Sequence, residues 1–404
     1  MTFRLQSHPT QLKTSCTASQ CASGPSLGNI SNKTPITERV PNRPPSIWAL
    51  LRHQNLISRT KAPSQCGTHG LRGSVSISRE SSSGNLRVNG LQYCRSNQCV
   101  FCSLQKQRLE AEKWTKLLLK AKKADLQVVF GVFTIRTSSR IQNSHALDVL
   151  KKATGLLLRK QWREKRGIVG HLRAYEMTFD IKTGKAHPHV NICIITSSST
   201  VIDSSWRDEL ASRWQTLVRK IDPRHSPDLD SGVFLQRLES KKDIEHVASY
   251  STKLGLESST SKEALLSFSK KSVGLNPREL LLLSLQGNQR ARFLFLHWQK
   301  LVSSLRRFCT SRGLKALLTD VDAPAEKEPI QAQSQTVVRF GPKSWSLVWS
   351  SNSLSNILDK LSCSSSHEDD LLAKLVYCCD FEMLSASDFL AYLEKWLVYK
   401  ALKT

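Results

Sequence analysis

The middle of this chain alternates between helix-type and strand-type spacing of its apolar residues, and this alternation is the strongest constraint on the fold. Helices place apolar residues three and four positions apart, whereas buried strands are short runs of β-branched and aromatic residues. The segments follow the order helix, strand, helix, strand, strand, helix, strand, helix. The expected helices are 104–124, 144–162, 203–221 and 241–254, and the expected strands are 127–136, 168–179, 187–196 and 233–240.

This order of elements predicts a protein of the α+β class. The β-α-β-β-α-β core is the order of the ferredoxin-like split βαβ arrangement, which forms an antiparallel sheet. In that arrangement the two central strands present one sheet face to a ligand, and helices cover the other face. We also expect flanking helices, a cysteine-bearing N-terminal module and a helical C-terminal extension.

Changes in composition predict the boundaries between the parts of the chain. Residues 1–63 are rich in Ser, contain one acidic and eight basic residues, and show no apolar periodicity, which indicates a disordered basic arm. We expect a cysteine-rich module at 64–103 and the sheet domain at 104–318. A linker is expected at 319–367, followed by a small helical appendage at 368–404.

The balance of charge indicates a polyanionic partner. The chain has 404 residues and a formal net charge of +26, and such a field concentrates phosphate groups near the surface, so nucleic acid is the first candidate. No apolar run is long enough to cross a bilayer, so no membrane partner is expected. Eleven cysteines, an odd number, indicate a reducing compartment, and we expect the cytoplasm. The acid-poor leader keeps an organelle as the alternative.

A candidate metal site lies on the strand expected at 187–196. Side chains alternate between the two faces of a strand, so His187, His189 and Asn191 project to the same side. Glu176 on the preceding strand is a candidate fourth ligand. Imidazoles with a carboxylate or amide oxygen suit a divalent ion that polarises a phosphate oxygen. The alternative is a set of ordinary polar residues on a solvent-facing strand.

Tyr250 is the candidate nucleophile, on the helix expected at 241–254. Lys253 lies three residues later and so shares a helix face with Tyr250. A tyrosine hydroxyl has an ordinary pKa of about 10, so attack on a phosphodiester requires a cation that stabilises the phenolate. The alternative is an interface tyrosine beside a solvated lysine.

Four cysteines, Cys66, Cys94, Cys99 and Cys102, lie in one short region before the sheet domain. Their spacing permits a tetrahedral thiolate site of the kind that holds structural zinc, with His69 as a substitute ligand. Unligated thiols are the alternative.

The motifs together resemble the rolling-circle replication initiators (Rep proteins) of small plasmids, in the His-hydrophobic-His (HUH) endonuclease superfamily, single-tyrosine type. The matching segments are 130–139, 169–179, 186–195 and 248–257. The histidines precede the tyrosine, as in initiators, whereas conjugative relaxases usually place the tyrosine first. Many such initiators also carry a cysteine-bearing segment before the first strand.

The resemblance implies a site-specific DNA endonuclease with strand-transfer activity. Tyr250 would form a 5′-phosphotyrosine at a plasmid origin and release a 3′-hydroxyl primer, with Mg²⁺ or Mn²⁺ as cofactor. Single-stranded or cruciform origin DNA is the expected partner, and a host helicase is a further candidate. Basic residues near the site are expected to follow the DNA backbone: Arg136, Arg140, Arg173 and Lys182.

One departure from the family pattern keeps other functions open. Asn191 stands where a second histidine is usual, and His187 on the same face is the rival second ligand. A weakened metal site favours a catalytically silent nucleic-acid-binding protein or repressor on the same fold. A mobilisation relaxase is the other alternative, which the order of the motifs disfavours.

Overall fold

The computed structural model describes residues 46–398, except residues 82, 138–141, 253–273, 313, 315–333 and 365. The chain divides into two compact units. In the described part, the larger unit comprises residues 47–73 and 91–314, and the smaller unit comprises residues 46, 74–90 and 334–398. The boundaries therefore differ from the expected ones, because the segment 64–103 contributes to both units.

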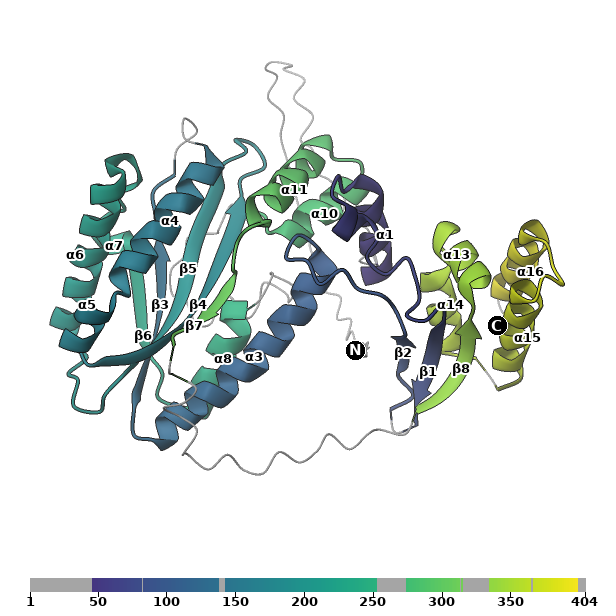
Figure 1. Ribbon diagram of the computed structural model, residues 1–404, viewed down its shortest axis with the longest axis horizontal. Helices are drawn as coiled ribbons and strands as arrows, with labels where there is room; N and C mark the ends of the chain where they lie inside the picture. The colour runs from purple at the N-terminus through teal and green to yellow at the C-terminus, as the bar shows by residue number, and fades with distance from the viewer. Residues whose placement is uncertain are drawn as a thin grey trace, which may run out of the picture. The chain divides into compact units, whose positions relative to one another are not determined.

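The larger unit is built on a five-stranded antiparallel sheet in the order β6-β3-β5-β4-β7 (Figure 1). This sheet confirms the α+β class, and its first four strands have the order of the split βαβ arrangement. The fifth strand, β7, was not expected. The strands are β3 (Gln127–Thr134), β4 (Ile168–Phe179), β5 (Ala186–Thr196), β6 (Val233–Arg237) and β7 (Phe308–Thr310).

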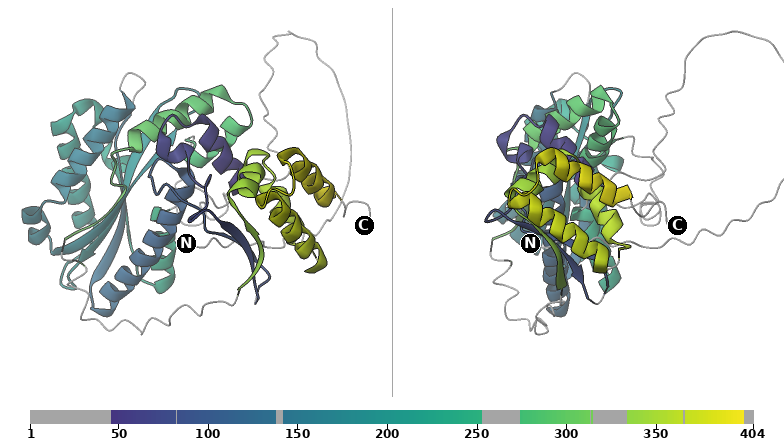
Figure 2. Two further views of the ribbon diagram at one scale, coloured as in Figure 1. Left: turned by 45° about the vertical axis from the view of Figure 1, so that its right-hand side comes forward. Right: turned by 90° about the vertical axis from the view of Figure 1, so that its right-hand side faces the viewer.

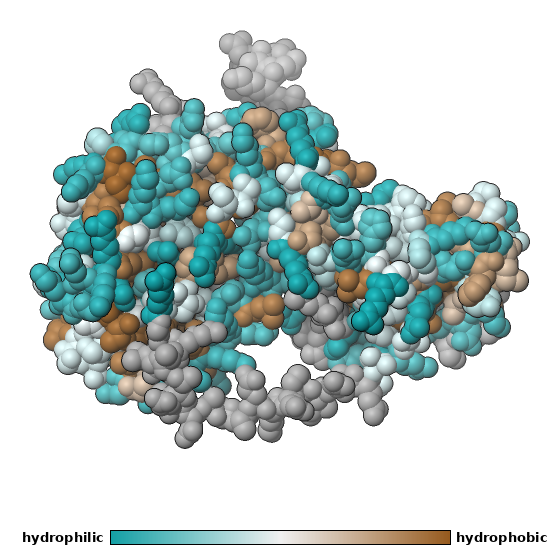
Figure 3. Space-filling view, viewed as in Figure 1, coloured by the Kyte–Doolittle hydropathy of each residue, from teal (hydrophilic) through white to brown (hydrophobic). Residues whose placement is uncertain are grey.

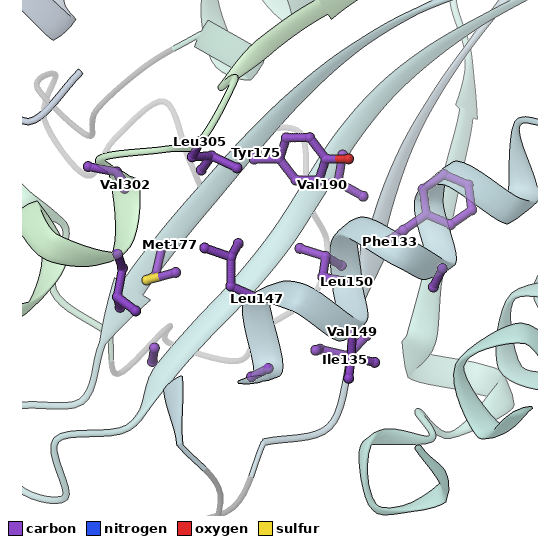
Figure 4. Close-up of a cluster of buried hydrophobic side chains, with 14 of the residues drawn as sticks. Phe133, Ile135, Leu147, Val149, Leu150, Tyr175, Met177, Val190, Val302 and Leu305 are labelled. Atoms are coloured by element: carbon purple, nitrogen blue, oxygen red, sulfur yellow. The ribbon is translucent and has the colours of Figure 1, made fainter. Parts of the chain in front are cut away.

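The first face of the sheet packs against α4 (Asn143–Leu157) and α6 (Ser204–Ile221). These helices bury one apolar stripe each against alternate residues of the strands. Figure 4 shows Leu147 and Leu150 of α4 lying with Tyr175 and Val190 of the sheet. Trp214 of α6 donates a hydrogen bond from its indole nitrogen to Thr134 O, at the end of β3, at 2.8 Å.

Helices also cover the second face of the sheet. Here α3 (Val100–Lys123) and α8 (Lys241–Thr252) pack on Phe130, Cys193 and Ile195 (Figure 1). The expectation that one face remains open is therefore wrong for this part of the sheet, because apolar residues follow the polar ones along β5. The polar residues at the start of β5 lie on this same second face.

Shorter elements complete the larger unit. The segment 46–63, expected within the disordered arm, contains α1, whose Trp48, Leu50 and Leu51 are buried. Their helical spacing allows α1 to bury an apolar face against α10. The remaining elements are α1 (Ile47–Ile57), α2 (Lys61–Ser64), α5 (Lys160–Lys165), η1 (Pro223–His225), α7 (Leu229–Gly232), α10 (Pro277–Leu285) and α11 (Gln289–Val302).

The smaller unit has a three-stranded antiparallel sheet in the order β2-β1-β8. The expected linker at 319–367 is wrong in its described part, since it contains β8 and two helices that bury apolar residues such as Val338 and Trp345. Figure 2 shows α15 and α16 side by side. The elements are β1 (Val75–Glu80), β2 (Leu86–Asn89), β8 (Ser334–Phe340), α13 (Pro342–Ser350), α14 (Leu354–Leu361), α15 (Ser366–Asp380) and α16 (Ala386–Val398).

The helices in the described ranges include none that is long and apolar enough to span a bilayer. On the face shown in Figure 3, hydrophobic patches are interspersed among hydrophilic residues.

Candidate active site and metal centres

The strand pair β4–β5 brings His189 and Glu176 into contact. The two residues are register partners, and Nε2 of His189 lies 3.0 Å from Oε2 of Glu176. Their side chains are 19% and 17% exposed, so the pair is mostly shielded from water yet reachable. The other carboxylate oxygen, Oε1, is buried and has no hydrogen-bond partner among the described residues.

A buried guanidinium lies near this carboxylate. Arg307 is 7% exposed and donates from Nε to Tyr175 O at 3.2 Å. Burial lowers the pKa of Arg307 to about 10, and the negative charge of Glu176 opposes that shift. Arg307 stays cationic at neutral pH and adds positive potential beside Glu176.

Asn191 lies on the same face, two residues further along β5. It pairs with Val132 of β3 and Ala174 of β4 and is fully buried. Neither its Oδ1 nor its Nδ2 has a hydrogen-bond partner among the described residues. A buried amide without partners costs about 1–3 kcal/mol, so this side chain calls for a partner beyond the residues that the structure describes.

His187 lies at the exposed start of β5, apart from the His189–Glu176 contact. Its Nδ1 is 3.3 Å from Oγ1 of Thr137. Partial burial lowers the pKa of His187, although Asp180 acts in the opposite direction. Within the described residues, His187, His189 and Glu176 do not converge into a three-ligand group. Glu176 is therefore better placed beside His189 than His187 is.

The helix that carries Tyr250 packs over the same sheet face as His189 and Asn191. Helix α8 buries Ile244, Val247 and Ala248 in the cluster that includes Cys193 of β5. Its start is capped reciprocally: Ser240 N donates to Asp243 at 2.9 Å, and Asp243 N donates to Ser240 Oγ at 3.1 Å. The backbone of α8 extends through position 250 to Thr252. The side chain of Tyr250 and the whole of Lys253 lie outside the described residues.

The four predicted cysteines converge around one point in the larger unit. Cys102 Sγ lies 3.5 Å from Cys66 Sγ and 3.6 Å from Cys94 Sγ, and the sulfurs of all four cysteines lie within 4.8 Å of one another. A tetrahedral zinc–thiolate site has Zn–S bonds of about 2.3 Å, which separates the sulfurs by about 3.8 Å. This cluster can hold a metal ion.

Local structure prepares the cysteine cluster for a cation. Cys99 caps α3, and its sulfur accepts hydrogen bonds from Cys102 N at 3.4 Å and from the Gln54 amide at 3.1 Å. Hydrogen bonds among the thiols lower the pKa of Cys94 and raise the pKa of Cys66 and Cys102, so Cys94 is the first of the three to become a thiolate. The substitute ligand His69 is exposed and lies outside the cluster, with Nδ1 2.7 Å from Thr68 Oγ1.

The structure describes three of the four basic residues expected at the DNA backbone. Arg136 and Lys182 are exposed, after β3 and in the β4–β5 turn respectively. Arg173 lies on the opposite sheet face from His189, with its guanidinium 5.7 Å from the centre of the Tyr175 ring. Arg140 lies outside the described residues.

A second group with metal-ligating side chains was not predicted from the sequence. His145, Asp222 and His225 each offer one ligand atom, and these atoms lie within 4.8 Å of one another. The residues are up to 80 positions apart, and only the packing of α4 against α6 brings them together. No local motif in the sequence signals this group.

The segment that contains strands β3 to β6 is similar to known proteins. Residues 85–274 match a family described as Replication protein. A curated relative from Streptomyces lividans, described as Protein rep, is 29% identical over 108 residues, which cover 22% of this chain. The match spans only 24% of that relative's length. No solved structure matches the chain. The chain is thus similar to replication proteins over residues 85–274, a segment that is just under half of its length.

Proposed function

We propose that this chain is a plasmid replication initiator that nicks one strand of origin DNA through a phosphotyrosine. The observation that carries the proposal is the packing of α8, which includes position 250, over the sheet face that holds the His189–Glu176 pair. Both parts lie within residues 85–274, the segment similar to replication proteins. Their common location supports one site rather than two unrelated ones.

In the proposed reaction, the Tyr250 phenol gives up its proton and its oxygen attacks a backbone phosphorus. A bond from phosphorus to the tyrosine oxygen forms as the bond to the 3′ oxygen breaks. The 3′ oxygen takes up a proton and becomes the primer hydroxyl, and the 5′ phosphate stays on Tyr250. One phosphodiester replaces another, so the reversed step rejoins the strand. Lys253 is proposed to stabilise the phenolate.

A divalent Mg²⁺ or Mn²⁺ ion would be held by His189 with Glu176 and Asn191, and His187 is the more distant candidate. Oε1 of Glu176 and Oδ1 of Asn191 are buried and lack partners within the described ranges, which supports this fit because hard ions prefer oxygen ligands. Such an ion, when bound, supplies polarisation of a phosphate oxygen and offsets negative charge on it. His189 and Glu176 hold each other in orientation through their 3.0 Å contact.

For the cysteine cluster we propose structural zinc. Three of its members, Cys66, Cys99 and Cys102, are buried, and a closed set of four thiolates leaves no position for a substrate. Cys99 caps α3, the helix that packs beside α8, so a metal here would stabilise the support of the Tyr250 helix.

The proposed partner is origin DNA, single-stranded or cruciform at the nick, in a bacterial cytoplasm, with a host helicase as a further candidate. Exposed Arg136 and Lys182 remain proposed phosphate contacts. Three lysines that line a pocket between α4, the β4–β5 turn and α11 add to them: Lys151, Lys185 and Lys300.

One feature favours a second function. Asn191 is a weaker ligand than the histidine usual at this position, and full burial restricts its rearrangement. A protein with a metal site that is too weak for catalysis would bind origin DNA on the same fold and act as a repressor. A relaxase is disfavoured because the histidines precede the tyrosine.

Nicking of single-stranded DNA separates these functions. Oligonucleotides that tile the replicon carrying this gene are incubated with the full chain and Mn²⁺ or Mg²⁺, and covalent adducts are resolved by denaturing electrophoresis. If the chain is the initiator, the protein becomes attached to the 5′ phosphate at one nick, and Tyr250→Phe abolishes this adduct. Tyr392→Phe, on an exposed residue of α16, is the matched control and retains the adduct. DNA binding without an adduct under either metal supports the repressor.

A further inference from the structure

We propose that His145, Asp222 and His225 form a separate binding site for a divalent transition metal such as Zn²⁺, Co²⁺ or Ni²⁺. His145 lies on α4, Asp222 links α6 to η1, and His225 ends η1. Nε2 of His145 is 2.8 Å from Oδ2 of Asp222, and the two imidazole rings are centred 5.5 Å apart. Ligands of one metal ion have this spacing.

The hydrogen bonds of His225 leave one ring nitrogen ready to bind a metal. Nδ1 lies 2.7 Å from the carbonyl oxygen of Arg136, which can only accept, so Nδ1 carries the proton of the neutral ring. Nε2 therefore presents a lone pair. His225 is fully buried, and Nε2 has no hydrogen-bond partner among the described residues. A backbone carbonyl that fixes the tautomer in this way is the usual support of a metal-binding histidine.

Asp222 supplies the negative charge of the group. Hydrogen bonds from Arg224, together with one from His145, hold the pKa of Asp222 well below its usual range, so the carboxylate is ionised. Arg224 donates to Oδ1 from Nε at 3.0 Å and to Oδ2 from Nη2 at 2.7 Å. The Arg224 side chain is 66% exposed and can move aside from Oδ2. A metal ion would compete with this guanidinium for the carboxylate.

The ligand set defines the class of metal. Two imidazole nitrogens and one carboxylate oxygen suit borderline transition ions and leave positions open for water. The cysteine cluster offers four sulfurs and therefore prefers softer metal ions. The His189–Glu176–Asn191 group is richer in oxygen and prefers harder ions. The three sites can therefore be distinguished by the ions they prefer.

The position of the group gives the metal a structural consequence for the strand that precedes it. Arg136 N donates to His225 O at 3.0 Å, so the backbone of Arg136 is clamped to His225 in both directions. Thr134, two residues earlier, ends β3 and is the register partner of His189. A metal on His225 would fix the exit of β3 on the far side of the sheet from the proposed nicking site.

Nickel binding to the reduced full chain tests the proposal. The chain carries His189→Ala to remove the ligand of the other histidine site, and it is first saturated with one equivalent of Zn²⁺ per cysteine cluster. Equilibrium dialysis should then find one further equivalent of Ni²⁺, which His145→Ala removes. His145 is 46% exposed, so its replacement need not disturb the core. His297→Ala, which replaces a half-buried residue of α11, is the control and retains the nickel.

Arg224→Ala supplies a test in the opposite direction. Removal of the competing guanidinium should tighten Ni²⁺ binding by roughly tenfold, because a cation next to a ligand repels the metal. Loss of folding cannot produce such a gain. Equal nickel stoichiometry with and without His145, or Ni²⁺ affinity that Arg224→Ala leaves unchanged or weakens, would overturn the proposal and leave a hydrogen-bonded cluster that takes no metal.

Discussion

Nε2 of His189 lies 3.0 Å from Oε2 of Glu176 across the β4–β5 pair, while the second oxygen of that carboxylate is buried and has no partner among the described residues. A carboxylate in this state can orient the imidazole with one oxygen and offer the other to a cation. Buried Arg307 balances part of its charge. The contact therefore makes Glu176, which the sequence left as the fourth ligand, the residue whose replacement is most informative.

Glu176→Gln should weaken metal-dependent nicking. The amide keeps the shape of the side chain but removes the charge, and a lost ligand or its orienting partner weakens metal binding by about 10–100-fold. We expect adduct formation to require a correspondingly higher Mn²⁺ concentration and to recover in excess metal. Glu245→Gln, on an exposed residue of α8, is the control. An unchanged dependence on Mn²⁺ concentration would exclude Glu176 from the metal site.

Asn191→Leu should separate the two roles of this buried amide. Leucine has a similar volume, and it removes two buried polar atoms that lack partners among the described residues. Without metal, we expect the free energy of unfolding to stay equal or to rise by about 1–2 kcal/mol. The increase in Tm on addition of Mn²⁺ should disappear. A metal-free protein destabilised by more than about 2 kcal/mol would instead indicate that the amide has a partner within the protein. Thermal unfolding with and without Mn²⁺ measures both effects.

The sheet could be predicted from the sequence because its strands carry their own signal. The runs expected at 168–179 and 187–196 agree with β4 and β5 to within one residue, since apolar β-branched residues and a glycine-containing turn define them locally. The alternation along β5 also placed His189 and Asn191 on one face before any contact was known.

The parts that could not be predicted depend on partners remote in sequence. Strand β8 pairs with β1 more than 250 residues earlier, so neither strand's partner can be identified from local spacing. The group of His145, Asp222 and His225 exists only because α4 packs on α6. Local spacing contains no trace of either arrangement.

Cys102→Ser should remove bound zinc from the reduced protein. Cys102 Sγ lies 3.5 Å from Cys66 Sγ and 3.6 Å from Cys94 Sγ, so serine in its place breaks the set of four thiolates. We expect the zinc content to fall by one equivalent and Tm to decrease, and a chelator should lower Tm of the parent chain in the same way. Cys363→Ser, on an exposed residue of the smaller unit, should change neither. Parent protein that contains no zinc when reduced would leave the thiols unligated, without bearing on the nicking proposal.

His171 should make the larger unit less stable in acid. Burial, with repulsion from Arg173 and Arg163, lowers the pKa of His171 to about 3, and its side chain is only 8% exposed. The unfolded chain binds a proton at this position near pH 6.5, whereas the folded chain does not until about pH 3, so this stability is present above pH 6.5 and is lost as the pH falls. The contribution changes by about 1.4 kcal/mol per pH unit between these limits. Between pH 6.5 and 4.5 the free energy of unfolding of His171→Gln should fall less steeply than that of the parent, by about 1.4 kcal/mol per pH unit. The exposed His69→Gln should follow the parent. Parallel pH profiles for the parent and His171→Gln would show that the imidazole takes up its proton without unfolding the chain.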